Sequence, residues 1–248
     1  MHELTPKLAE EWHILDTGTA SAKENMRIDC ELLQETASRE KPVLHLYEWK
    51  GNCATYGHFL DPYQLLHQDV AERHRLELAK RPTGGGLVFH LTDFAYSILI
   101  PAGHPGYSIN TLKNYAFINR MIVRVVKKFT KGNIRPTLHP KGKSSLENHF
   151  CMAKPTQYDV MVEGRKVGGA AQRRTKPGFL HQGTIAIALP PEDILISVLK
   201  SDSFRREMKQ NTYALLPQCV PPQGITEARQ HLRTLLIEEC IGSSNCYP

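Results

Sequence analysis

Four short motifs, spread over residues 81–184, hold the residue types of this chain that are best suited to chemistry. Successive glycines let a backbone approach a ligand without a Cβ in the way. A lysine beside a Gly-Gly pair places a compact positive charge next to exposed backbone N–H groups. The combination predicts a cleft that binds an acid or an acyl group. The motifs are Arg81-Pro82-Thr83-Gly84-Gly85-Gly86-Leu87-Val88-Phe89-His90, Phe150-Cys151, Gly164-Arg165-Lys166-Val167-Gly168-Gly169-Ala170-Ala171-Gln172-Arg173-Arg174 and His181-Gln182-Gly183-Thr184.

The motifs do not match the common nucleotide and metal signatures. The glycine triplet lacks the Gly-Lys-Ser/Thr ending of a P-loop and the spacing of a dinucleotide-binding turn. Six cysteines, at positions 30, 53, 151, 219, 240 and 246, show no C-x-x-C spacing, so we predict free thiols and no metal site. Plainer roles stay open: Lys166 as a solvated surface lysine, His181 as a structural histidine and Cys151 as a buried inert thiol.

Composition sets broad limits on the kind of protein. The chain has 248 residues, of which 41% are hydrophobic and 23% charged, which is ordinary for a globular enzyme. No stretch approaches the roughly 18 to 20 apolar residues that cross a bilayer. The N-terminus lacks a basic segment followed by an apolar one, so we predict a cytoplasmic protein without a membrane partner. The net charge of +6 fits a nucleic acid, an acidic protein or a small anion equally well.

The first half of the sequence alternates helical and extended patterns. Apolar positions over about three turns, after a serine cap, predict a helix at 21–33. Alternating or apolar runs predict strands at 42–47 and 53–59. One-sided leucines among charges predict a helix at 61–78. Two apolar runs, 87–89 and 94–100, are predicted to pair as neighbouring strands.

The second half predicts the remaining elements and one domain. Helices are expected at 112–129, 192–199 and 225–239, a hairpin at 158–162 and 166–171, and a strand at 184–188. Strands and helices intermingle without βαβ alternation, which favours an α+β domain with a mixed sheet. We expect a catalytic domain over 1–200, with 201–248 as its C-terminal helical extension and loose tail.

Together the motifs resemble those of the lipoate-protein ligase and octanoyltransferase family, which shares the biotin/lipoate ligase catalytic-domain fold. The resemblance runs from about residue 15 to 199 and also includes Asn25-Met26, Asp29, Leu46-Tyr47-Glu48-Trp49 and Tyr56-Gly57. It implies a mixed, largely antiparallel sheet packed with helices. It also implies attachment of an octanoyl or lipoyl group to one lysine of a lipoyl domain.

The resemblance assigns roles to individual residues. Gly84, Gly85 and Gly86 would line the acyl site and, in ligases, accept the phosphate of an acyl-adenylate. Lys166 would be catalytic, because a fixed charge stabilises negative charge that develops at the acyl carbonyl. The remaining residues assigned to substrate binding are Arg81, Thr83, His90, Gly168, Gly169, Gln172, His181, Gly183 and Thr184.

Cys151 bears on the mechanism. One branch of the family passes the acyl chain through a cysteine thioester, and Cys151 precedes Pro155 by four residues, as in that branch. A thiolate suits thioester exchange, because it is a strong nucleophile. Only 48 residues follow Lys200, too few for the accessory domain of full ligases. Gly86 points the other way, because the cysteine-using branch often has arginine there. We therefore predict a Cys151-dependent octanoyltransferase, with an ATP-dependent lipoate-protein ligase as the alternative.

The two mechanisms imply different cofactors and donors. The transferase needs no cofactor and takes its acyl group from octanoyl-acyl carrier protein, whereas the ligase needs ATP and Mg. The implied acceptors are lipoyl domains of 2-oxoacid dehydrogenase complexes or the glycine cleavage H protein. The basic clusters would steer these acidic partners. A nucleic-acid binder is the competing class, and it would show a steep loss of affinity with salt.

Overall fold

The computed structural model describes residues 12–140, 156–216 and 220–242. Its strands are β1 (His13–Ala20), β2 (Val43–Trp49), β3 (Cys53–Tyr56), β4 (Glu77–Lys80), β5 (Leu87–Phe89), β6 (Asp93–Pro101), β7 (Thr137–Leu138), β8 (Val160–Val162), β9 (Arg165–Arg174) and β10 (Gly178–Ala186). Its helices are α1 (Ala22–Glu35), α2 (Gln68–Arg73), α3 (Thr111–Phe129), α4 (Glu192–Val198), α5 (Asp202–Asn211) and α6 (Pro222–Gly242), with 3-10 turns η1 (Thr36–Ser38) and η2 (Pro62–Gln64).

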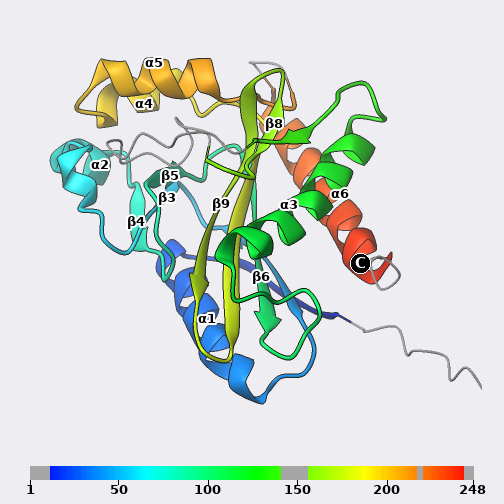
Figure 1. The fold of residues 1–248 in the computed structure, drawn as a ribbon. Coiled ribbons are helices and arrows are strands. Elements are labelled where there is room, and N and C mark those ends of the chain that lie inside the picture. The colour runs from blue at the N-terminus through cyan, green and yellow to red at the C-terminus, as the bar shows by residue number, and fades with distance from the viewer. Residues whose placement is uncertain (1–11, 141–155, 217–219, 243–248) are drawn as a thin grey trace, which may run out of the picture.

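Two sheets form the frame of the molecule (Figure 1). The large sheet has the order β1-β2-β6-β10-β9-β8-β7, and the small sheet has the order β4-β3-β5. Among the strand pairs of the described residues, β1–β2 and β3–β4 are parallel and the others antiparallel. The α+β class with a mixed, largely antiparallel sheet is confirmed.

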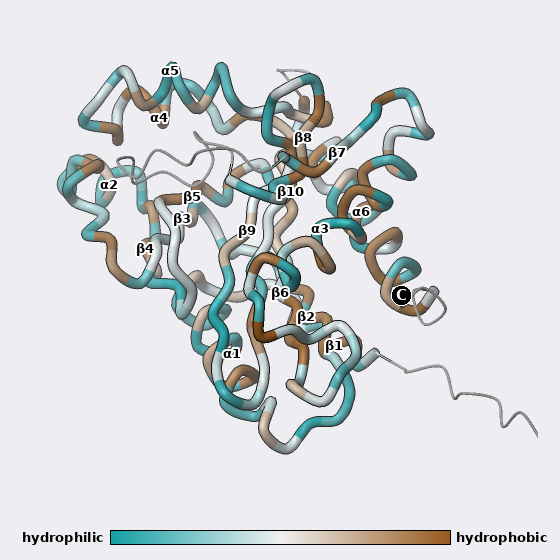
Figure 2. The backbone as a smooth tube through the Cα atoms, viewed as in Figure 1, coloured by the Kyte–Doolittle hydropathy of each residue, from teal (hydrophilic) through white to brown (hydrophobic). Residues whose placement is uncertain are grey.

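The two faces of the large sheet have different partners. Alternate residues of β6 pack against α3 and α6 in the main core, among them Phe94, Tyr96 and Ile98. The intervening residues face the other side, where α1 and the small sheet lie. Hydrophobic and hydrophilic stretches alternate along α3 and α6, as a helix with one buried face requires (Figure 2). No described helix is long and apolar enough to cross a membrane.

Several predicted elements are confirmed. The helix predicted from Ser21 is α1, and the Ser21 side chain caps it by accepting from the Glu24 N–H. The hairpin at 158–171 is β8 and β9, joined at Glu163 and Gly164, which have φ values of 50° and 74°. Positive φ at both central residues gives the tight turn that matches the twist of two antiparallel strands.

The helix predicted over 61–78 is wrong. Its residues form η2 and α2, and the chain then turns at Arg75, whose φ is 50°, into strand β4. This strand pairs with β3, and its Glu77 carboxylate accepts the backbone N–H groups of Ala22 and Lys23 at the start of α1. A tertiary partner therefore outweighs the local helical spacing.

The pairing predicted for 87–89 with 94–100 is also wrong. Strand β5 pairs with β3 in the small sheet, while β6 pairs with β2 and β10 in the large one. The three residues between them carry the chain from one sheet to the other. This crossing brings His90 and Asp93 together, as described below.

Strand β1 and helix α5 are among the elements that were not predicted. Strand β1 is a half-exposed edge strand, so it lacks a clear apolar alternation. Helix α5 buries only Phe204 and Met208, because most of its residues are polar. The predicted C-terminal helix is present as α6, and its Leu232 and Leu236 belong to the main core.

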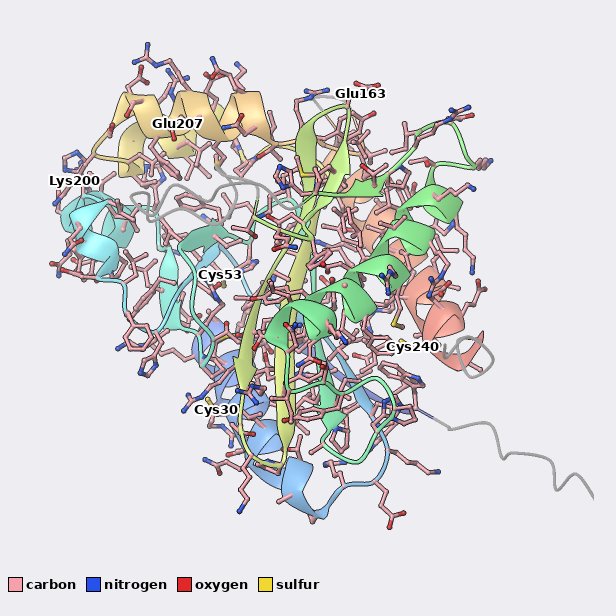
Figure 3. All side chains as sticks on the ribbon, viewed as in Figure 1. Cys30, Cys53, Glu163, Lys200, Glu207 and Cys240 are labelled. Atoms are coloured by element: carbon pink, nitrogen blue, oxygen red, sulfur yellow. The ribbon has the colours of Figure 1, made fainter. Side chains whose placement is uncertain are left out.

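The described cysteines lie in three separate places, on α1, on β3 and near the end of α6 (Figure 3). Cys30, Cys53 and Cys240 are all free thiols. Burial raises the pKa of Cys53 to about 11. The thiol of Cys53 therefore stays protonated near neutral pH and is a poor nucleophile.

Candidate active site

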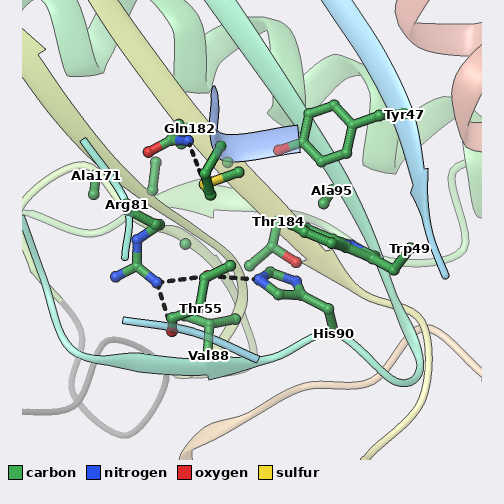
Figure 4. Close-up of a pocket in the computed structure, with 14 residues that line it drawn as sticks. Tyr47, Trp49, Thr55, Arg81, Val88, His90, Ala95, Ala171, Gln182 and Thr184 are labelled. Carbon is green, nitrogen blue, oxygen red and sulfur yellow. Dashed lines mark hydrogen bonds between the residues drawn. The ribbon is translucent and has the colours of Figure 1, made fainter. Parts of the chain in front are cut away.

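A pocket lies where the two sheets meet (Figure 4). The pocket is lined by Met26, Tyr47, Trp49, Thr55, Arg81, Val88, His90, Ala95, Gly169, Ala170, Ala171, Gln182, Gly183 and Thr184. Most of these side chains are apolar or aromatic, and the polar ones gather around Arg81 and His90.

The glycine loop, residues 83–86, forms one edge of this site. Arg81 braces it: one guanidinium nitrogen donates to the carbonyls of Gly84 at 3.1 Å and Gly86 at 2.6 Å. The Thr83 carbonyl accepts from the His58 N–H at 3.0 Å. Arg81 is 5% exposed, so its guanidinium group interacts mainly with protein atoms and little with solvent.

The carbonyls of Thr83, Gly84 and Gly86 thus face protein donors. None of the hydrogen bonds found within the described residues uses the N–H groups of Gly84, Gly85 or Gly86. Gly85 also has a φ of 89°, a backbone shape that glycine adopts without strain. A run of N–H groups without acceptors can bind the oxygen of an acyl group or of a phosphate.

A buried polar chain runs from Arg81 along the pocket wall. Thr55 Oγ1 lies 2.8 Å from an Arg81 nitrogen and 2.7 Å from His90 Nε2. His90 Nδ1 lies 2.7 Å from Asp93 Oδ2, which also accepts from the Thr184 hydroxyl. The His90 ring stacks on Trp49 with centroids 4.1 Å apart. His90 is therefore held rigidly at the pocket wall.

Asp93, at the end of this series of hydrogen bonds, stays charged although it is buried. Burial acts to raise the pKa of Asp93. The charge of His90 and hydrogen bonds from His90 and Thr184 outweigh that effect, so the pKa lies below its usual range. Asp93 therefore remains a carboxylate beside the site.

Lys166 lies beyond the lining residues, on strand β9 three residues before Gly169. It is 1% exposed, so it is not a solvated surface lysine. Its ammonium lies 2.8 Å from Asp159 Oδ2. The same carboxylate oxygen accepts the N–H of Thr156 at 2.6 Å and its hydroxyl at 2.9 Å. A buried lysine held by a carboxylate is fixed in position.

Gln172 and His181 do not line the pocket. They point to the other face of the large sheet, where the Gln172 amide lies 2.8 Å from His181 Nδ1. The His181 ring packs between Tyr96 and Tyr115. Burial lowers the pKa of His181 to about 3. The imidazole is therefore neutral in the folded protein at any pH near neutrality.

Neutral burial of His181 predicts a loss of stability in acid. Its pKa is lowered on folding, so the unfolded chain takes up a proton below its ordinary value of 6.5, while the folded chain resists until about 3. Between pH 7 and pH 5 the free energy of unfolding should fall by about 2 kcal/mol from this group alone.

Urea denaturation at the two pH values checks this. His181→Gln should remove that part of the pH dependence, whereas the exposed control His67→Gln should leave it in place. An unchanged difference between pH 7 and pH 5 in His181→Gln would show that another group is responsible.

The other predicted residues divide in the same way. Arg81, His90, Gly169, Gly183 and Thr184 line the pocket. Thr83 and Gly84 to Gly86 are not among the lining residues, and they form the loop between the lining residues Arg81 and Val88. Gly168 faces α3, because a Cβ added to it would lie 3.7 Å from the Ile122 side chain. A Cβ on Gly183 would lie 2.2 Å from the Tyr96 ring, so glycine is needed there for packing. Cys151 lies outside the described residues.

Sequence reasoning missed much of the wall, including Met26, Thr55 and Gln182. One signal was present for Gln182. Because side chains alternate along a strand, Gln182 and Thr184 must share one face of β10, and His181 and Gly183 the other. The apolar wall residues carried no comparable signal. Within the described part of the chain, no group of three or more His, Cys, Asp or Glu side chains is placed to hold a metal ion.

Comparison with solved structures supports the fold. The structure is similar to a putative lipoate protein ligase from T. acidophilum, with a TM-score of 0.66 and 17% identity over 91% of this chain and 85% of that one. It is also similar to lipoate-protein ligase A bound with ATP, with a TM-score of 0.59 and 19% identity over 91% and 85%.

Sequence comparison supports the family. Octanoyltransferase LipM of Carboxydothermus hydrogenoformans is 32% identical over 199 residues, which are 80% of this chain and 72% of that protein. LipM of Bacillus subtilis is 28% identical over 82% of this chain and 75% of its own length. The model of the lipoyl protein ligase A/B catalytic domain matches residues 21–241. With this match over nearly all of the described structure, the chain belongs to the lipoyl protein ligase A/B catalytic domain family, as an enzyme of octanoyl or lipoyl transfer.

Proposed function

We propose that this protein moves an octanoyl group from the thioester of an acyl carrier protein to a lysine of a lipoyl domain, through a thioester on Cys151. One observation carries the proposal: a largely apolar pocket is lined by Arg81, which binds a glycine loop whose N–H groups have no acceptor within the described residues. Such a site suits a medium-length acyl chain with its carbonyl oxygen at the loop.

The apolar part of the pocket would hold the acyl chain. Met26, Val88, Ala95 and Ala171 come from α1, β5, β6 and β9, so the chain would be enclosed from both sheets. Burying about eight carbons gains roughly 0.8 kcal/mol for each methylene removed from water. The pocket wall therefore supplies binding, and the polar groups supply orientation.

The proposed reaction has two displacement steps. The Cys151 thiolate attacks the donor thioester carbonyl, a new carbon–sulfur bond forms, and the carrier leaves as a thiolate. The neutral amine of the acceptor lysine then attacks the acyl-enzyme, an amide forms, and the Cys151 thiolate leaves while the amine loses its proton to solvent. Each step passes through an oxyanion, which the loop N–H groups and the Lys166 ammonium would stabilise.

The relatives are consistent with this choice of donor. The LipM proteins are named octanoyltransferases, and transfer from a thioester requires no cofactor. The acceptor class rests on an archaeal relative of similar fold, a bi-partite lipoate protein ligase described with its E2 lipoyl domain.

An ATP-dependent ligase is the second candidate. Its support is the fold shared with a ligase that binds ATP, and the complete glycine triplet. In that reaction the same loop N–H groups would face the phosphate of an acyl-adenylate, and ATP and Mg would be required. The loop geometry is compatible with both, so the donor has to be tested directly.

A donor assay distinguishes the two. The full chain is incubated with octanoyl-acyl carrier protein, and its intact mass is measured before and after hydroxylamine, which cleaves thioesters. We expect one octanoyl adduct on the wild-type protein, which hydroxylamine removes and which is lost when an apo lipoyl domain is added. Cys151→Ser should form no adduct that hydroxylamine removes as a labile thioester.

The contrary result is also specific. If no adduct forms and octanoate or lipoate with ATP instead gives pyrophosphate and a modified lipoyl domain, the protein is a ligase. Full activity of Cys151→Ala in either assay would exclude the thioester route.

A further inference from the structure

A buried chain of hydrogen bonds connects α1 to the glycine loop. Its members are 0–6% exposed and come from α1, the large sheet and the start of the loop. They are Asp29, His45, Ser97, Gln182 and Thr83. Because an unsatisfied buried polar group costs free energy, a buried chain of this length fixes the positions of all its members.

Asp29 is the hub of this chain. Its Oδ1 lies 2.8 Å from His45 Nδ1. Its Oδ2 accepts from the Ser97 hydroxyl at 2.7 Å and from the Gln182 amide nitrogen at 2.6 Å. A carboxylate only accepts hydrogen bonds, so each of these partners must donate.

Gln182 connects Asp29 to Thr83, because its amide group forms a hydrogen bond with each of them. With its NH₂ group turned toward Asp29, the amide presents its oxygen on the opposite side. That oxygen accepts the Thr83 hydroxyl at 2.6 Å. The Thr83 side chain is therefore held as a donor, one residue before Gly84, while its carbonyl accepts from His58 at 3.0 Å.

We propose that Asp29 is a positioning residue of the transfer reaction: through Gln182 it sets the hydrogen-bond direction of Thr83 and so the position of the glycine loop. The proposal rests on the proposed function for its effect on catalysis. Gln182 also lines the pocket, where its amide nitrogen lies 3.2 Å from the Met26 sulfur. The same amide thus couples the loop to the pocket wall.

Replacing Asp29 by asparagine removes the fixed direction of the chain. The new NH₂ group can face His45 Nδ1, or it can face the NH₂ group of Gln182. In the second arrangement the Gln182 amide turns over, and its nitrogen faces the Thr83 hydroxyl. We expect kcat/KM for octanoyl transfer to fall about tenfold, which corresponds to one misdirected buried hydrogen bond.

An exchange of the two groups gives the decisive test. Q182E alone places two carboxylates in contact and should lose at least as much activity as D29N. In the double variant D29N/Q182E, the amide introduced at position 29 donates to the carboxylate introduced at position 182, and that carboxylate again accepts from Thr83. The Ser97 hydroxyl can turn toward the Tyr47 hydroxyl, 3.4 Å away. We expect kcat/KM to recover to within about threefold of wild type. D69N, on the exposed face of α2, is the matched control and should be unchanged.

A second readout does not depend on activity. Hydrogen–deuterium exchange of residues 82–88 should quicken in both single variants and return to the wild-type rate in the double variant. If the wild type transfers no acyl group, the proposed function fails, yet this exchange experiment still tests the network. The proposal is overturned if Q182E keeps wild-type kcat/KM and exchange, or if the double variant is no better than Q182E.

Discussion

Replacing Lys166 by methionine is expected to lower kcat about 10²- to 10³-fold, the cost of removing one group that stabilises an oxyanion. The same change should destabilise the fold. Lys166 is 1% exposed and pairs with Asp159 at 2.8 Å, so its loss leaves a buried carboxylate without this partner. Breaking a buried ion pair on one side costs about 3–5 kcal/mol.

A double variant separates these two effects. In K166M/D159N both charges are gone, and the asparagine oxygen can still accept from Thr156, as Asp159 does. Urea denaturation should show most of the lost stability restored, while kcat for octanoyl transfer remains as low as in K166M. Recovery of activity together with stability would show that Lys166 is structural only.

Replacing Gly57 by alanine is expected to lower kcat/KM about 100-fold, because a misplacement near 1 Å in a catalytic group has that effect. A Cβ on Gly57 would lie 1.9 Å from the Gly85 carbonyl oxygen and 2.8 Å from the Gly84 carbonyl carbon. Both are backbone atoms, so no side-chain rotation relieves the clash, and the glycine loop must move.

The free energy of unfolding of Gly57→Ala should fall by only about 1–3 kcal/mol, as for an overpacked site. Gly103→Ala is the matched control, because no heavy atom lies within 4 Å of its Cβ position. Transfer kinetics and denaturation of the two variants measure the contrast. Wild-type kinetics in Gly57→Ala would show that the position of the loop has little influence on the reaction.

Local chemistry explains which predicted elements were confirmed. The α1 cap at Ser21 and the turn at Glu163 and Gly164 depend on residues a few positions apart, which can be read from the sequence. The elements that were wrong depend on distant partners. Residues 77–80 form a strand because β3 and α1 hold them, and β5 leaves β6 because β3 pairs with it.

The site shows the same division. The motifs contain Arg81, His90 and Thr184, and these residues do line one pocket. Their partner Thr55 lies in none of the motifs, and Trp49 lies in one but was given no role. Both reach His90 only because the two sheets meet. Gln182, which lies inside a motif, was passed over in favour of His181, although strand alternation separates the two faces.

The sequence alone determined the family, the α+β class and several residues that line one pocket, because motifs and turns depend on short, contiguous stretches of residues. Only the tertiary structure decided where those residues point. It buried Lys166 beside Asp159, turned Gln172 and His181 away from the pocket, and linked Asp29 to the glycine loop. The physical reason is that burial and hydrogen-bond direction depend on strands paired across the fold, and no local pattern specifies that pairing.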